Sequence, residues 1–141
     1  KHGCVLVSKR NTVLSTGYNG PIHGIDDAKM PSTRPEKYWP TIHSEENCFL
    51  SYNGSFSDLD GARIYITGEP CYKCLRAILQ KGVKHIIHGH VASKCIDEED
   101  RAAKKLILEL VKDVKIEEYN TFENIQNLLN QTSAYVQNKA L

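Results

Sequence analysis

The regular alternation of strand-like and helix-like segments is the feature that most constrains the fold. Short apolar or alternating runs typical of strands lie at residues 4–8, 11–16, 62–67, 83–88 and 114–119. Helical spacing and helix-end signals lie at residues 43–52, 71–80, 97–112 and 121–139. After the first hairpin each strand precedes a helix, and right-handed crossovers then place the helices on the faces of one sheet. We predict an α/β fold, a three-layer α/β/α sandwich with a central mixed sheet of about five strands.

The length of the chain is sufficient for one hydrophobic core. Its 141 residues, 40% of them hydrophobic, predict a single domain over residues 1–141. Lys1 lies two residues before an apolar run, which leaves room for an N-terminal helix upstream of this sequence. The sequence contains neither a run of ~20 apolar residues nor a signal-peptide pattern, so we expect no membrane partner.

A long polar segment covers residues 23–40 and contains Pro31, Pro35 and Pro40. Loops longer than ~12–15 residues are uncommon in compact domains and are often functional. The segment is therefore interpreted either as a lid or subunit contact, or as a tolerated insertion.

The charges argue against a nucleic-acid partner. Lys and Arg number 18 against 17 Asp and Glu, and the two signs are interleaved along the chain. Proteins that bind nucleic acid without sequence preference usually carry a clustered basic face. A small-molecule substrate is favoured.

The cysteines indicate metal or redox chemistry rather than structural disulfides. Five are present, an odd number, and the only close pair is Cys71 and Cys74. This usage favours a reducing, cytoplasmic location. We expect Cys4 and Cys95 to be buried thiols and Cys48 to be a core residue of its helix.

The most specific signal combines His43-Ser44-Glu45 with Cys71 and Cys74. Catalytic zinc sites use three nitrogen or sulfur ligands and leave a fourth position for water. The two cysteines are three apart at a helix start, so their sulfurs point to one side, and the helix dipole favours their thiolates. We predict one Zn²⁺ per chain, held by His43, Cys71 and Cys74, with Pro70 as the first residue of the cysteine helix.

Glu45 lies in the same turn as His43, where it is placed to act as general acid and base. A Cys-x-x-Cys pair alone is as often a structural zinc knuckle or a redox pair, and a lone His-x-Glu is close to chance. A closed structural site gives Glu45 no role, and redox chemistry leaves both His43 and Glu45 unexplained. The combination therefore favours a catalytic zinc, and the hypothesis for its chemistry is hydrolysis that releases an amine, with Glu45 moving the protons.

These residues resemble the His-x-Glu and Pro-Cys-x-x-Cys signature of the cytidine deaminase superfamily, and the resemblance runs from Gly3 to His88. Within it, the segment 16–21, Thr-Gly-Tyr-Asn-Gly-Pro, and the pair Asp26-Asp27 are most similar to deoxycytidylate (dCMP) deaminases. The resemblance implies a single zinc-dependent deaminase domain that converts a cytosine nucleotide, dCMP, to dUMP and ammonia.

The resemblance also implies substrate contacts and an assembly. Asn19 corresponds to a residue near the deoxyribose, and Ser44 stands where relatives usually have Ala, with its backbone amide facing the base. Relatives are commonly homo-oligomers, often hexamers with nucleotide feedback. Some relatives bind a second zinc. In this sequence the 23–40 segment offers only His23 as a ligand for one, so a second zinc is not expected. Phosphate recognition is not assigned, and the candidates for it are Arg34, Lys29, His88 and His90.

Other functions stay open at this point. The same chemistry could act on a free base, a nucleoside or an adenosine in tRNA, although the near-neutral charge disfavours RNA. A zinc-stabilised regulatory module without turnover is a third interpretation, against which the presence of Glu45 argues. Tyr38 and Trp39 could stack on a base, but packing of the 23–40 segment against the body is the favoured interpretation.

Overall fold

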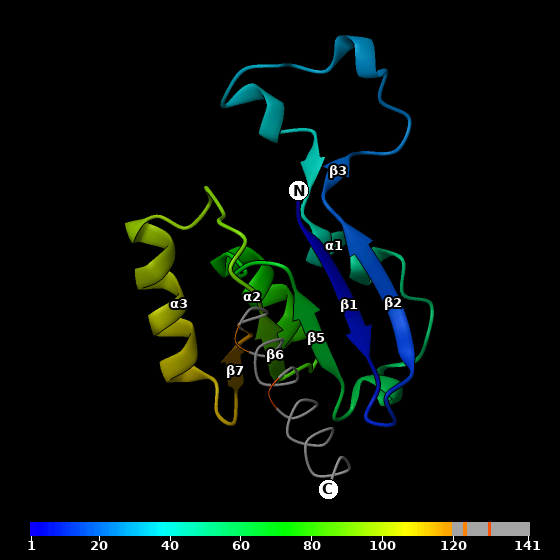
Figure 1. The fold of residues 1–141 in the computed structure, drawn as a ribbon, viewed down its shortest axis with the longest axis vertical. Helices are drawn as coiled ribbons and strands as arrows, with labels where there is room; N and C mark the ends of the chain where they lie inside the picture. Colours follow the sequence, from blue (N-terminus) through cyan, green and yellow to red (C-terminus); the bar gives the residue numbers. More distant parts are fainter. Residues whose placement is uncertain (120–122, 124–129, 131–141) are drawn as a thin grey trace, which may run out of the picture.

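The computed structural model, which describes residues 1–119, 123 and 130, is built around a mixed sheet (Figure 1). Its five strands are ordered β2-β1-β5-β6-β7. They are β1 (Gly3–Val7), β2 (Val13–Tyr18), β5 (Arg63–Ile66), β6 (His85–His88) and β7 (Lys115–Glu118). Strand β1 is antiparallel to β2 and β5, whereas β5, β6 and β7 are parallel. The predicted mixed sheet of five strands is confirmed.

Helices follow the strands as predicted. They are α1 (Ser44–Leu50), α2 (Tyr72–Gln80) and α3 (Glu98–Leu110). Figure 1 shows α1 and α2 behind the sheet and α3 beside α2. The helix predicted over residues 121–139 lies outside the described residues. None of the described helices combines the length and the apolar character that crossing a membrane requires.

The core lies between one face of the sheet and the helices α1 and α2. Its fully buried side chains come from both layers and include Leu6, Ile64 and Ile86 from strands, and Cys48, Leu75 and Ile78 from helices. Burial of Cys4 and Cys48 agrees with the prediction. Val5, Tyr65 and Ile87 alternate with core residues along their strands. They line a cavity of about 900 Å³, referred to below as the second cavity.

Helix α3 departs from a simple amphipathic pattern. The buried polar residues Asp100 and Lys104 lie within it, whereas Leu106 and Leu110 are 56% and 74% exposed. Its first turns pack against the start of α2, where a polar network described below occupies the contact.

The 23–40 segment is carried on a small sheet of its own. Strands β3 (Gly20–Pro21) and β4 (Thr41–Ile42) pair antiparallel and support a projection that contains two 3₁₀ turns, at the top of Figure 1. Trp39 is 75% exposed, so the prediction that it packs against the body is wrong. Strands β3 and β4 lead away from the main sheet, so the segment lies beyond the end of that sheet in Figure 1.

A close approach between β2 and α1 requires glycine at position 17. A Cβ atom there would lie 2.1 Å from the carbonyl oxygen of Ser44 and 2.5 Å from the backbone nitrogen of Cys48. The Ser15 hydroxyl donates to the Cys48 carbonyl at 2.7 Å, and the Cys4 thiol donates to the Ser44 carbonyl at 3.2 Å. These contacts fix the first turn of α1 against the sheet.

Candidate metal centre

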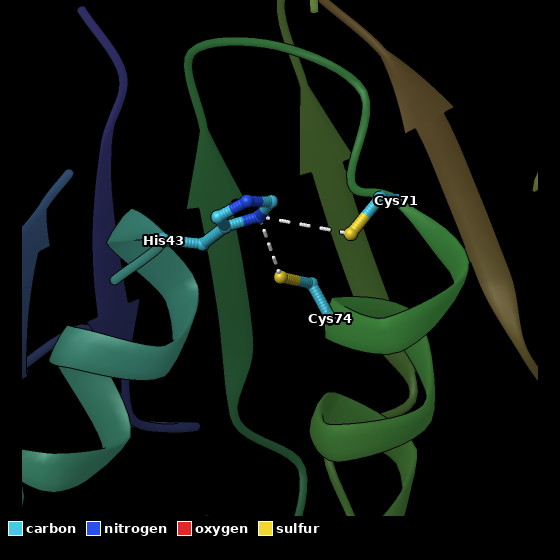
Figure 2. A group of neighbouring side chains, drawn as sticks. All are labelled: His43, Cys71 and Cys74. Atoms are coloured by element: carbon cyan, nitrogen blue, oxygen red, sulfur yellow. Dashed lines mark hydrogen bonds between the residues drawn. The ribbon is translucent and has the colours of Figure 1, made fainter. Parts of the chain in front are cut away.

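Three side chains converge from two helix starts (Figure 2). His43 is the N-cap of α1, Cys71 is the N-cap of α2, and Cys74 lies in the first turn of α2. Nδ1 of His43 is 3.6 Å from Sγ of Cys71 and 3.4 Å from Sγ of Cys74. The structure therefore brings the three predicted ligands together. Pro70 precedes the N-cap, so its predicted place as the first helical residue is wrong by two positions.

The spacing of these donor atoms fits a tetrahedral zinc ion. Zn–S and Zn–N bonds of about 2.3 and 2.0–2.1 Å at tetrahedral angles separate nitrogen from sulfur by roughly 3.6 Å. The three donors lie within 4.8 Å of one another, and no other such group of three was found in the described part of the chain. Both cysteines are only 6% exposed, which suits a soft, thiolate-rich site.

Without a metal, the cluster shares its protons unevenly. Hydrogen bonds from the Cys74 thiol and the His43 ring stabilise the Cys71 thiolate and lower the pKa of Cys71. The same hydrogen bond, together with burial, raises the pKa of Cys74, and the Cys71 sulfur raises the pKa of His43. A cation that binds both sulfurs must displace the proton on Cys74, so metal affinity increases as the pH rises.

A buried carboxylate lies beside the cluster. Glu45 and Ser44 are 6% and 0% exposed and line a cavity of about 500 Å³ together with His43 and Cys71. The Ser44 hydroxyl donates to Oε2 of Glu45 at 2.7 Å. Sequence reasoning considered only the backbone amide of Ser44, although a hydroxyl directly before a carboxylate was a visible signal.

Asn19 lines the same cavity, as its predicted role near the sugar requires. Its side-chain oxygen accepts a hydrogen bond from the backbone N–H of His2 at 2.7 Å. With the oxygen held in this way, the NH₂ group of Asn19 is the part that can donate to a ligand.

The phosphate candidates separate into two groups. Arg34 lines the cavity. Lys29 instead pairs with Asp26 at 3.6 Å, while His88 and His90 line the second cavity. Only Arg34 among the four candidates therefore lines the cavity of the metal centre.

Cys95 differs from its prediction. It is exposed rather than buried, and its sulfur lies 3.9 Å from Nε2 of His43. The connection from β6 to α3 passes along the cavity, and Cys95 lines the cavity with its neighbours from that connection. Its spacing from the other cysteines carried no signal of this position.

A polar network missed by sequence reasoning supports the cysteine helix. Oδ1 of Asp100, which is 2% exposed, accepts a hydrogen bond from the backbone N–H of Tyr72 at 2.6 Å. Lys104 pairs with Oδ2 of Asp100 at 2.8 Å and also with Glu69. The N-cap Cys71 makes no side-chain hydrogen bond to the amides of its own helix, because its sulfur faces the cluster. Asp100 therefore supplies the cap from another helix.

Residues 1–90 match the family model described as the cytidine and deoxycytidylate deaminase zinc-binding region. The chain belongs to this family. The expectations of a cytidine deaminase superfamily member and of one zinc site per chain are thereby confirmed.

Similar proteins include deaminases from animals and bacteria. Mouse deoxycytidylate deaminase is 30% identical over 114 residues, which cover 77% of this chain and 62% of the mouse protein. An uncharacterised deaminase of Aliivibrio fischeri is 36% identical over 81 residues, 57% of this chain and 53% of that protein. The chain thus spans between one half and two thirds of the length of these relatives.

The fold is shared with a solved deaminase structure. The dCMP deaminase of cyanophage S-TIM5, in complex with dCMP and dUMP, superposes with a TM-score of 0.60 at 23% identity. The match covers 84% of this chain and 81% of the cyanophage chain. It confirms the cytidine deaminase-like architecture.

The three clustered side chains are expected to be necessary for zinc binding. His43→Ala, Cys71→Ser and Cys74→Ser should each fall well below one zinc per chain, because a site of three protein ligands loses one of them. Zinc content is measured by plasma emission after dialysis. Cys95→Ser is the matched control and should retain the wild-type content, and zinc loss in that variant would contradict the assignment.

Asp100 is expected to stabilise the metal centre through the start of α2. Asp100→Ala leaves the Tyr72 amide without its acceptor, at a cost of roughly 1–3 kcal/mol in the free energy of unfolding. Zinc release to a chromophoric chelator should be faster, whereas Asp100→Asn, which keeps an acceptor, should be affected less. Release from the Ala variant at the wild-type rate would show that the cap does not hold the site.

Proposed function

We propose that this protein is a zinc-dependent hydrolytic deaminase of a cytosine nucleotide, converting dCMP to dUMP and ammonia. The observation that carries the proposal is the buried carboxylate of Glu45 in one cavity with His43 and Cys71 of the three-donor cluster. Membership of the zinc-binding deaminase family supports the reaction type. The names of the mouse relative and of the cyanophage structure support the nucleotide substrate.

The residues of the cluster would hold the metal. His43, Cys71 and Cys74 would supply one nitrogen and two sulfurs, one donor fewer than tetrahedral zinc accepts, and His43 and Cys71 line the cavity. When bound there, zinc would act as a Lewis acid that lowers the pKa of water, which makes hydroxide available as a nucleophile near neutral pH.

Glu45 performs the proton transfers in this mechanism. Its carboxylate accepts a proton from the attacking water and delivers it to the ring nitrogen of the base. After the water oxygen has bonded to the amine-bearing carbon, Glu45 carries the second proton of that water to the departing amine. The carbon–nitrogen bond then breaks, ammonia leaves, and the oxygen remains as the new carbonyl of the base.

Two residues of the cavity, Ser44 and Asn19, orient the reacting groups. The Ser44 hydroxyl donates to Oε2, which fixes the rotation of the carboxylate and leaves Oε1 for the substrate and water. The NH₂ group of Asn19 is available to donate to the sugar. A cavity of about 500 Å³ is within the usual range for small-molecule sites and suits a mononucleotide.

Glu45→Gln is expected to remove the proton carrier while preserving the site. The amide keeps the side-chain volume and can still accept from Ser44, so zinc should remain bound. Turnover of dCMP, followed by ammonia release, should fall by about 10²–10⁴-fold. Glu46→Gln changes the exposed neighbouring carboxylate and should keep wild-type turnover.

The same assay decides the substrate when dCMP, CMP, deoxycytidine, cytosine and an adenosine-containing RNA are compared. The proposal expects dCMP to react with the highest kcat/KM. Reaction of the RNA alone, or of none of these compounds with the zinc-loaded protein, would contradict it.

Homo-oligomeric assembly and a cytoplasmic location belong to the same proposal. Tyr18, Leu50 and Phe56 are 72%, 67% and 69% exposed, and burial against a second copy would remove this apolar surface from water. The five free cysteines support a reducing compartment. Sedimentation velocity is expected to show a multiple of the 15.9 kDa chain, and a single species of that mass would rule out the assembly.

A further inference from the structure

The cavity of the metal centre carries an excess of positive charge. Four cationic side chains line it, namely those of Lys1, Arg34, Lys37 and Lys94, against the carboxylates of Glu45 and Glu69. Glu69 is already paired with Lys104 from α3. None of the four cations forms an ion pair with another residue in the part of the chain that the structure describes. The excess charge is therefore available to an anionic ligand.

One aromatic ring holds two of these cations. The guanidinium carbon of Arg34 lies 5.2 Å from the centroid of the Tyr38 ring, and Nζ of Lys37 lies 5.4 Å from it. A cation–π contact of this kind restrains a cation through the ring quadrupole and does not cancel its charge, as a carboxylate partner would. The N–H donors of both side chains stay free to bind a ligand.

Lys94 reaches the same cavity from a different part of the chain. It lies in the connection between β6 and α3, whereas Arg34 and Lys37 belong to the projection between β3 and β4. Arg34 and Lys94 are exposed and Lys37 is half-buried, while the reacting end at Glu45 is buried. The cavity thus runs from a buried reacting end to an exposed cationic end.

We propose that Arg34, Lys37 and Lys94 bind the 5′-phosphate of the nucleotide substrate, and that Tyr38 positions the first two. This inference rests on the proposed deamination of a cytosine nucleotide. With the base at Glu45, the phosphate is the only strongly charged group of the substrate and extends toward the exposed end. Phosphate oxygens form short, strong hydrogen bonds with guanidinium and ammonium donors.

The ratio of kcat/KM for dCMP to that for deoxycytidine measures phosphate recognition. A lost charge-assisted contact should lower this ratio by roughly tenfold or more in Arg34→Ala, and further in Arg34→Ala/Lys37→Ala. Lys94→Ala should also lower it. Lys29→Ala, which removes an exposed lysine of the same projection outside the cavity, is the matched control and should keep the ratio.

Equal melting temperatures of the variants and the wild type verify that the comparison concerns folded protein. A double variant of Arg34 and Lys37 with the wild-type ratio would overturn the inference. The ratio would also stay at the wild-type value if these cations bind a regulatory nucleotide or a free phosphate ion and not the substrate.

Tyr38→Leu tests the positioning role of the ring. Leucine keeps apolar bulk but lacks the quadrupole, so all three cations remain while two lose their restraint. The ratio should fall less than in Arg34→Ala. The fall should come from a higher KM for dCMP, with kcat unchanged. An unchanged KM would contradict the role of Tyr38.

Binding of the product separates this inference from the proposed function. Calorimetry with the zinc-loaded protein should show tighter binding of dUMP than of deoxyuridine, and inorganic phosphate should compete with dUMP. Both effects should be weaker in the double variant than in Lys29→Ala. If no cytosine compound is deaminated, the proposed function fails, while equal dUMP binding by the double variant and Lys29→Ala would overturn the phosphate site independently.

Discussion

The meeting of one imidazole with two sulfurs is the constraint on which the rest of the site depends. The three donors come from two helices that begin at the metal centre, and their separations of 3.4 and 3.6 Å suit a single tetrahedral ion. Without a metal, the hydrogen bond to Cys71 and burial hold the pKa of the Cys74 thiol above its usual range. A dication bound there would compensate the negative charge of two thiolates.

Because the metal donors lie at helix starts, the first backbone amides of these helices need hydrogen-bond partners. A helix beginning at a metal-facing cysteine cannot be capped by that residue, and here Asp100 of α3 caps α2 in its place. The acceptor is itself buried and charged, so Lys104 must accompany it. The need to cap the cysteine helix thus explains why an aspartate and a lysine are buried in α3, a helix with exposed leucines.

Much of the fold followed from local sequence, because alternating strands and helices connected by short crossovers permit few arrangements. His43, Cys71 and Cys74 were also predictable, since their chemical types and spacing match one ion. Contacts between distant side chains were not predictable. The exposure of Cys95 depends on the path of a connection, and the role of Asp100 depends on how α3 docks, neither of which leaves a local pattern.

The small β3–β4 sheet closes the base of the projection, where Gly20 pairs with Ile42 and the N–H of Ile22 donates to the carbonyl oxygen of Pro40. Residues on the projection therefore reach the cavity without taking part in the core. Sequence change there is expected to alter ligand preference at little cost to folding, because the reacting groups are built on the sheet and its helices. Recognition and chemistry in this chain can consequently diverge at different evolutionary rates.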